Sequence, residues 1–182
     1  MIQLDVFSAA RAGGAASLLA RLDALGVGRA LESLATKFPT ALTRGGNVNR
    51  GRQLAQQHPA AQCVRCHTIG KQVSVVGPPL DGIASRLGRM DLLEALVNPS
   101  ARIAPGFGAV AVTLRNGQRV EGVLHEETET MVTVEDGANV RHRLEKTAIA
   151  SRTNLPSAMP PMGAILTPIE IRDVIEYLGT LK

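Results

Sequence analysis

Residues 63–67 read Cys63-Val64-Arg65-Cys66-His67, a C-x-x-C-H segment, and its two cysteines are the only ones among 182 residues. Two thiols at this spacing can add to the two vinyl groups of one porphyrin, and the adjacent histidine can then ligate the iron. The segment predicts one covalent haem c, with Cys63 and Cys66 as thioether donors and His67 as an iron ligand. It constrains the fold strongly, because the chain must pack around the ring.

Two other interpretations of the cysteine pair are weaker. A redox C-x-x-C usually precedes a helix in a βαβ pattern, and no such pattern surrounds residues 63–67. A zinc site normally needs four ligands, so Cys63, Cys66 and His67 would require a fourth from elsewhere. A histidine directly after a cysteine is also awkward for tetrahedral closure. Haem attachment remains the favoured interpretation.

Composition narrows the possible partners. Hydrophobic residues make up 45% of the chain but aromatic residues only 2%, so a buried porphyrin would add apolar surface that the side chains lack. The net charge is +4, and no run of Lys and Arg with interleaved aromatics indicates nucleic-acid binding. No stretch approaches the ~18 apolar residues of a membrane span. We expect neither nucleic acid nor a membrane span.

The first forty residues have helical periodicity. Apolar stripes broken at Gly13-Gly14 and Gly26-Val27-Gly28 predict about three short helices within residues 2–38, either the end of a helical-repeat domain or helices that pack on the next domain of the chain. The N-terminus does not resemble a signal peptide, because it lacks a basic region and because Asp5 and Arg11 interrupt any apolar run. Because covalent haem attachment takes place outside the bacterial cytoplasmic membrane, we expect either a piece of a longer, periplasmic or otherwise exported protein or an exported chain numbered after processing.

The change of period along the chain predicts three domains: a helical segment over residues 1–40, a haem domain over 41–106 and 152–182, and a β module over 107–151. The haem domain is predicted to contain a helix over 49–66, short helices near 81–87 and 89–97, and a last helix over 167–181. Thr167, Pro168 and Glu170 form a capping box with proline at the first helical position.

The β module has period two. Val110, Val112 and Leu114 alternate with other residues, and Asn116-Gly117 is a hairpin signal. Met131–Val134 and Val140–Leu144 flank a second turn at Asp136-Gly137. The pattern predicts four or five strands in a meander, as a small barrel or curled sheet.

The sixth iron ligand has five candidates, which are Met159, Met162, His58, His125 and His142. Met159 is favoured, because the Pro-rich loop Ser157–Gly163 can deliver a thioether without helix geometry. A lone methionine otherwise serves as core filler. The Pro78 carbonyl is the predicted acceptor for the second ring nitrogen of His67, and Leu80 is predicted to press on the porphyrin. Arg86, Arg89 and Arg102 are candidates to pair with the propionates or are ordinary surface residues.

These residues resemble class I cytochromes c over residues 47–104 and 155–182. The resemblance rests on Gly51, the C-x-x-C-H segment, Gly77-Pro78-Pro79-Leu80, a late methionine and a final helix with Glu176-Tyr177-Leu178. Asn98–Phe107, a strand module and Ser157–Pro160 look like the C-terminal haem-binding domains of large planctomycete-type proteins, in which helical repeats or a propeller-type dehydrogenase domain often precede the haem domain.

The resemblance implies a mainly α cytochrome c fold with an inserted small antiparallel β module, α+β overall, with His67 and Met159 as iron ligands. Ala55 stands near a position where an aromatic residue is usual, which predicts a looser contact between the first and last helices. Electron transfer is the implied role, and no catalytic constellation near the motif indicates an enzyme, although a parent protein can be a dehydrogenase.

Two alternatives stay open: a haem enzyme or gas or redox sensor with an open or displaceable sixth ligand, and an interaction module in which haem is structural. Charge suggests a partner. Residues 44–102 hold eight basic and three acidic side chains, whereas residues 116–146 hold four basic and seven acidic. Either surfaces differ by chance, or the haem-bearing half steers toward an acidic redox protein or domain.

Overall fold

The structure, a computed structural model, describes residues 39–182. In this range the chain forms two compact units. The helical unit comprises the described residues up to Val75 together with Pro79–Asn98 and Pro161–Lys182, and the sheet unit comprises Val76–Pro78 and Pro99–Pro160. The helices predicted within residues 2–38 lie outside the described residues.

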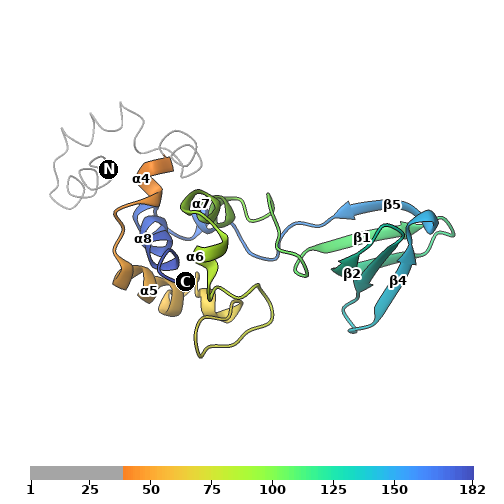
Figure 1. Ribbon diagram of the computed structural model, residues 1–182, viewed down its shortest axis with the longest axis horizontal. Coiled ribbons are helices and arrows are strands. Elements are labelled where there is room, and N and C mark those ends of the chain that lie inside the picture. Colours follow the sequence, from red (N-terminus) through yellow and green to blue (C-terminus); the bar gives the residue numbers. More distant parts are fainter. Residues whose placement is uncertain (1–38) are drawn as a thin grey trace. The chain divides into compact units, whose positions relative to one another are not determined.

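Short helices make up the described part of the helical unit (Figure 1). They are α4 (Pro39–Thr43), α5 (Val48–Gln57), α6 (Ile83–Arg86), α7 (Arg89–Val97) and α8 (Pro168–Leu178), with 3₁₀ turns η1 (Cys63–Arg65) and η3 (Met162–Ala164). The longest, α8, has 11 residues. Within residues 39–182 no helix combines the length and the apolar character that crossing a membrane requires.

Helix α5 begins at a side-chain cap and ends before a proline. The Asn47 side chain accepts a hydrogen bond from the Arg50 amide (2.9 Å). A residue before proline is driven out of the helical region, and His58, which precedes Pro59, is extended (φ −62°, ψ 129°). The helix predicted over residues 49–66 is therefore too long, and the C-x-x-C-H segment lies on a separate turn.

Helix α8 begins as the sequence predicts. The Glu170 carboxylate accepts a hydrogen bond from the Thr167 amide (2.8 Å), and Thr167 Oγ1 accepts one from the Glu170 amide (3.4 Å). Pro168 occupies the first turn, where its missing N–H costs nothing. The predicted capping box is confirmed.

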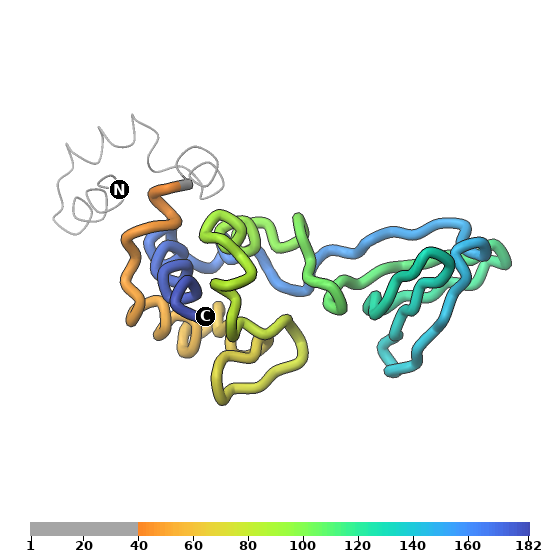
Figure 2. The backbone as a smooth tube through the Cα atoms, viewed as in Figure 1, coloured from red at the N-terminus to blue at the C-terminus, as the bar shows by residue number. Residues whose placement is uncertain are grey.

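Helices α5 and α8 touch through their backbones. A Cβ atom at Gly51 would lie 2.0 Å from the Asp173 carbonyl oxygen and 2.8 Å from Tyr177 Cβ. Figure 2 shows these two helices side by side, although they come from opposite ends of the described chain. Ala55 is fully buried. The contact is tight, so the expectation of a looser one was wrong: a glycine, rather than a large residue, sets the helix separation.

Five antiparallel strands form the sheet unit (Figure 1). They are β1 (Ala109–Leu114), β2 (Arg119–Glu127), β3 (Met131–Glu135), β4 (Arg141–Glu145) and β5 (Ile149–Asn154), in the spatial order β4-β3-β2-β1-β5. The first four follow one another as a meander. The 3₁₀ turn η2 (Lys146–Ala148) then leads into β5, which pairs with β1.

The β1–β2 hairpin forms at the predicted Asn116-Gly117 signal, with a three-residue loop. The Leu114 amide donates to the Gln118 carbonyl (2.8 Å), and the Gly117 amide donates to the Leu114 carbonyl (2.9 Å). Gly117 has φ 89°, a left-handed conformation that glycine adopts without a steric cost. The loop is the hairpin form in which a left-handed residue ends the turn.

The sheet buries its own hydrophobic core. Six side chains are at most 8% exposed, namely Val110, Val112, Val120, Val132, Val134 and Leu144, and Leu114, Leu124 and Ile149 pack against them. The alternation predicted for β1 places Val110 and Val112 in this core. Strand β5 extends the sheet beyond the strands that the sequence pattern marks.

The predicted fold class is wrong. The chain is not a mainly α cytochrome c fold with a small β insertion, because the five strands form a compact unit with a core of its own. Two differences between the predicted and the observed elements account for the error. Strand β5 is mostly polar and has only two partly buried residues, so it gives little alternation signal. The helix before Cys63 is also much shorter than its predicted span.

Candidate haem-attachment site

The C-x-x-C-H segment lies on one tight turn after α5. Cys63–Arg65 form η1, and the Cys63 carbonyl accepts hydrogen bonds from the amides of Cys66 (3.1 Å) and His67 (2.8 Å). Hydrogen bonds to this one carbonyl therefore hold the backbone of Cys66 and His67 close to Cys63. Both cysteines are free thiols. The turn thus presents two thiols and an imidazole on five residues of backbone.

The two thiols differ in environment. Cys63 is partly buried and Cys66 is exposed. Burial raises the pKa of the Cys63 thiol to about 11, because the thiolate would lose hydration, and a backbone hydrogen bond offsets only part of this effect. Redox-active C-x-x-C pairs depend on a cysteine with a lowered pKa. A protonated Cys63 at neutral pH disfavours the redox interpretation.

The donor set can be compared with the groups it could hold. Among the described residues, no three His, Cys, Asp or Glu side chains are placed to hold one metal ion. Cys63, Cys66 and His67 therefore do not converge as zinc ligands do. Two free thiols beside an imidazole do fit a haem c, which is attached at its edge through sulfur and ligated at its iron through nitrogen.

The loop after His67 is closed by hydrogen bonds. The Leu80 amide donates to the Thr68 carbonyl (2.9 Å), and the Gly70 amide donates to the Asp81 carboxylate (2.9 and 3.1 Å). Leu80 is half-buried and is held against the residue next to His67. Pro78 belongs to the short segment grouped with the sheet unit, and its role as acceptor for His67 stays a prediction.

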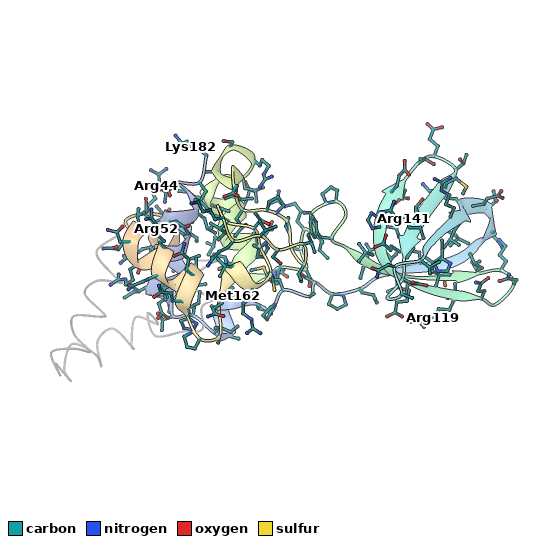
Figure 3. The ribbon with its side chains drawn as sticks, turned by 90° about the horizontal axis from the view of Figure 1, so that it is seen from below. Arg44, Arg52, Arg119, Arg141, Met162 and Lys182 are labelled. Carbon is teal, nitrogen blue, oxygen red and sulfur yellow. The ribbon has the colours of Figure 1, made fainter. Side chains whose placement is uncertain are left out.

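The two methionines of the Pro-rich loop fall in different units. Met159 belongs to the sheet unit, is half-buried, and its amide donates to Ser157 Oγ (3.2 Å). Met162, labelled in Figure 3, is only 5% exposed and begins η3, which contacts α7 and α8. Met162 thus has the ordinary packing role of a methionine. Met159 as the sixth ligand stays a prediction.

The three histidine candidates for the sixth ligand have protein partners. His58 Nδ1 accepts hydrogen bonds from the amides of Ala60 (3.2 Å) and Ala61 (2.9 Å). His125 lies 3.2 Å from the Glu135 carboxylate and His142 lies 2.8 Å from the Asp136 carboxylate, both within the sheet unit. Each imidazole therefore has a local structural role.

Two of the candidate propionate partners have other contacts. Arg89 forms a two-pronged ion pair with Glu176 (2.6 and 2.8 Å) and donates to the Thr43 carbonyl (2.8 Å). Arg86 donates to the Pro79 carbonyl (2.6 Å) and the Asp81 carbonyl (3.2 Å). Arg102 is an exposed residue of the sheet unit. Arg89 therefore holds helices together.

Two acidic residues on α8 have partners that the sequence did not indicate. Asp173 is fully buried, accepts a hydrogen bond from the Asn47 amide (2.7 Å) and pairs with Arg50. The Glu176 carboxylate accepts hydrogen bonds from the Arg89 guanidinium and from the Gly46 amide (3.3 Å). Both lie on α8 and tie it to the start of α5. The final-helix pattern includes Glu176, but no local pattern indicates the partners of either acid, because those partners are far away along the chain.

Two surface hollows of the helical unit are lined by residues outside the C-x-x-C-H segment. One, of about 600 Å³, is lined by residues of α4 and the start of α7, including Arg44 and Arg89. The other, of about 360 Å³, is lined by Arg52, Tyr177, Leu181 and the loop around Gly70. Neither is lined by Cys63, Cys66 or His67, so neither defines the attachment site.

Comparison with known proteins does not place the chain in a family. No family model and no curated protein matches it. One similar solved structure is described as "1.55 A Crystal structure of the pleiotropic translational regulator, Hfq". It is 24% identical, covers 35% of this chain and 92% of that chain, and has a TM-score of 0.24, which is too low to establish a shared fold.

Proposed function

We propose that this chain carries one covalent haem c and transfers electrons, as a module of a larger exported redox protein. The observation that carries the proposal is the turn at residues 63–67, which presents the free thiols of Cys63 and Cys66 next to His67. A bound haem c supplies a one-electron iron couple. The residues of the chain attach, orient and cover that group.

Each proposed role rests on a residue's chemistry. Cys63 and Cys66 would hold the ring through thioether bonds, and His67 would ligate the iron. The Pro78 carbonyl would orient the His67 imidazole, Leu80 would pack on the ring, and Met159 would supply a thioether ligand to the iron. The hydrogen bonds that close the loop at Thr68 and Leu80 would keep this surrounding structure in place when the charge on the iron changes.

Electron transfer is favoured over catalysis by how the carboxylates of the helical unit are used. Among the described residues of this unit, five carboxylates cap helices or loops or form ion pairs, namely Asp81, Asp91, Glu170, Asp173 and Glu176, and the sixth, Glu94, is exposed on α7. A redox protein or domain with an acidic docking face is the proposed partner, since basic residues are in excess over residues 44–102.

Haem staining after denaturing electrophoresis tests the attachment. The chain is exported in a bacterial host that matures c-type cytochromes, and the wild type should keep its stain because thioether bonds survive denaturation. Cys63→Ala/Cys66→Ala should lose the stain. Met90→Ala, at an exposed methionine outside the motif, should keep it and serves as the control. A wild-type band that does not stain would contradict the proposal.

A further inference from the structure

Apolar side chains gather on the surface of the loop after His67. Val73 is 78% exposed, Val75 87% and Val76 64%, whereas Met90 and Val140 are exposed singly elsewhere. Single exposed apolar residues are ordinary, but a cluster marks an interaction surface. Val73 and Val75 both belong to the helical unit and are here called the valine pair.

The backbone between the two valines is held in place. The Ser74 amide donates to Thr68 Oγ1 (3.0 Å), and Thr68 Oγ1 donates to the Ser74 carbonyl (2.8 Å). Ser74 Oγ donates to the Arg65 carbonyl (3.3 Å), within the attachment turn. The valine pair is therefore presented on ordered backbone next to the C-x-x-C-H segment, so binding would require little further ordering.

Positive charge borders the valine pair. Arg65 and Lys71 are exposed, and neither forms an ion pair with a described carboxylate. The nearby Asp81 carboxylate is held by the Gly70 amide. In the sheet unit, by contrast, three arginines, Arg119, Arg141 and Arg152, each pair with a glutamate. The charge around the valine pair is thus not neutralised within the described chain.

We infer that the valine pair, bordered by Arg65 and Lys71, docks a protein redox partner whose contact face has an apolar centre surrounded by carboxylates. This inference rests on the proposed function, because the partner would exchange electrons with the haem at Cys63 and Cys66. The valines supply contact area at the centre, and the two cations supply charge complementarity and faster encounter.

The test compares a protein acceptor with a small one. Reduced holoprotein is mixed in a stopped-flow instrument with a negatively charged blue-copper protein and, separately, with hexacyanoferrate(III). Val73→Ser/Val75→Ser should lower the second-order rate with the copper protein about fivefold or more, the usual scale for losing central interface contacts. The rate with hexacyanoferrate and the haem spectrum should not change. Val140→Ser removes an exposed valine of the sheet unit and should change none of these.

Three results would overturn the inference. An unchanged rate with the copper protein would show that the valine pair does not dock it. A shifted haem spectrum, or a matching change with hexacyanoferrate, would show that the valines cover the haem instead. A wild type without haem stain refutes the proposed function before any kinetics are measured, and this inference with it. Val75→Thr, which keeps the side-chain shape, repeats the test if the double variant misfolds.

Discussion

At Gly51 the absence of a side chain decides how closely two helices can pack. Alanine is the better helix former by about 1 kcal/mol, so propensity alone would make Gly51→Ala stabilising. The new Cβ would instead meet the Asp173 carbonyl oxygen at 2.0 Å, and a backbone atom in a helix cannot move aside alone. Helix α5 would have to separate from α8.

We expect Gly51→Ala to lower the free energy of unfolding by about 2 kcal/mol, at the scale of overpacked cores. Urea denaturation of the holoprotein measures it. Gly137→Ala is the matched control, because nothing lies within 4 Å of a Cβ there. A Gly51→Ala variant as stable as the wild type would mean that the helices do not touch as described.

The two methionines of the Pro-rich loop separate ligation from packing. Met159→Ala should abolish the absorption band of the oxidised haem that reports methionine–iron ligation, because Met159 is the proposed sixth ligand. Met162→Ala should keep the band but lower the free energy of unfolding by roughly 2–5 kcal/mol, as for other buried methionines. Visible spectra and denaturation curves of both variants check this. Loss of the band in Met162→Ala alone would assign the ligand to Met162.

Among the elements, α4, α7 and α8 are joined by one arginine. Arg89 on α7 binds Glu176 on α8 and the Thr43 carbonyl on α4. The hydrogen bond from Arg89 is the largest cause of the lowered pKa of Glu176, and the charge of Arg89 adds to it, whereas desolvation opposes it. The ionised carboxylate of Glu176 is therefore more stable in the folded chain than in the unfolded chain.

A lowered pKa fixes the sign of the pH dependence. The stability from Glu176 is complete above its unfolded pKa, ~4.3, and is lost as pH falls through the lower folded value. The Arg89→Met variant should therefore be less stable than the wild type at pH 7. As the pH falls below 5, its free energy of unfolding should decrease less than that of the wild type. Denaturant midpoints across pH measure this. Arg86→Met, whose arginine binds carbonyls only, should follow the wild-type profile, and a parallel Arg89→Met profile would contradict the prediction.

The strands show which elements a local pattern can predict. Alternating valines locate β1, and a glycine with φ 89° explains the hairpin at Asn116-Gly117. The sequence predicts four or five strands but locates only the first four. Strand β5 could not be located, because an edge strand that is mostly exposed has no need for apolar alternation. What makes it a strand is pairing with β1, a contact far away in the sequence.

For the whole molecule, charge is divided between segments of the chain. Basic residues are in excess over 44–102 and acidic residues over 116–146. In the sheet unit, salt bridges link opposite charges, such as Glu127 with Lys146 (2.9 Å) and Arg152 (2.7 Å), and these hold the pKa of Glu127 at about 2. Arg119 and Arg141 of this unit are labelled in Figure 3.

Steering by the basic segment predicts a salt-dependent rate. The second-order rate with an acidic redox acceptor should fall as ionic strength rises, since screening acts over ~10 Å at 0.1 M salt. At low salt, Arg65→Glu should lower the rate more than Arg119→Glu, because Arg119 already pairs with Glu121. Stopped-flow rates across ionic strength measure this. A rate that does not change with salt would rule out electrostatic steering.

Features that depend on neighbouring residues could be predicted from the amino-acid sequence. The spacing of Cys63, Cys66 and His67 places two thiols and an imidazole on one turn, whatever the rest of the fold. The start of α8 at Thr167 and the β1–β2 hairpin likewise depend on a few adjacent residues. The end of α5 at Gln57 was also readable, since a proline two residues later forbids continuation, but helical periodicity hid it.

Features that depend on distant partners could be seen only in the folded chain. Three features form only when strands and helices pack together. They are the five-stranded sheet as a compact unit, the pairing of β5 with β1, and the burial of Asp173. The same holds for Arg89, a candidate propionate partner whose guanidinium instead binds Glu176. Burial and long-range hydrogen bonds stabilise these features, and both depend on groups that are distant in the sequence. A local pattern of residue types therefore does not predict which distant group will be the partner.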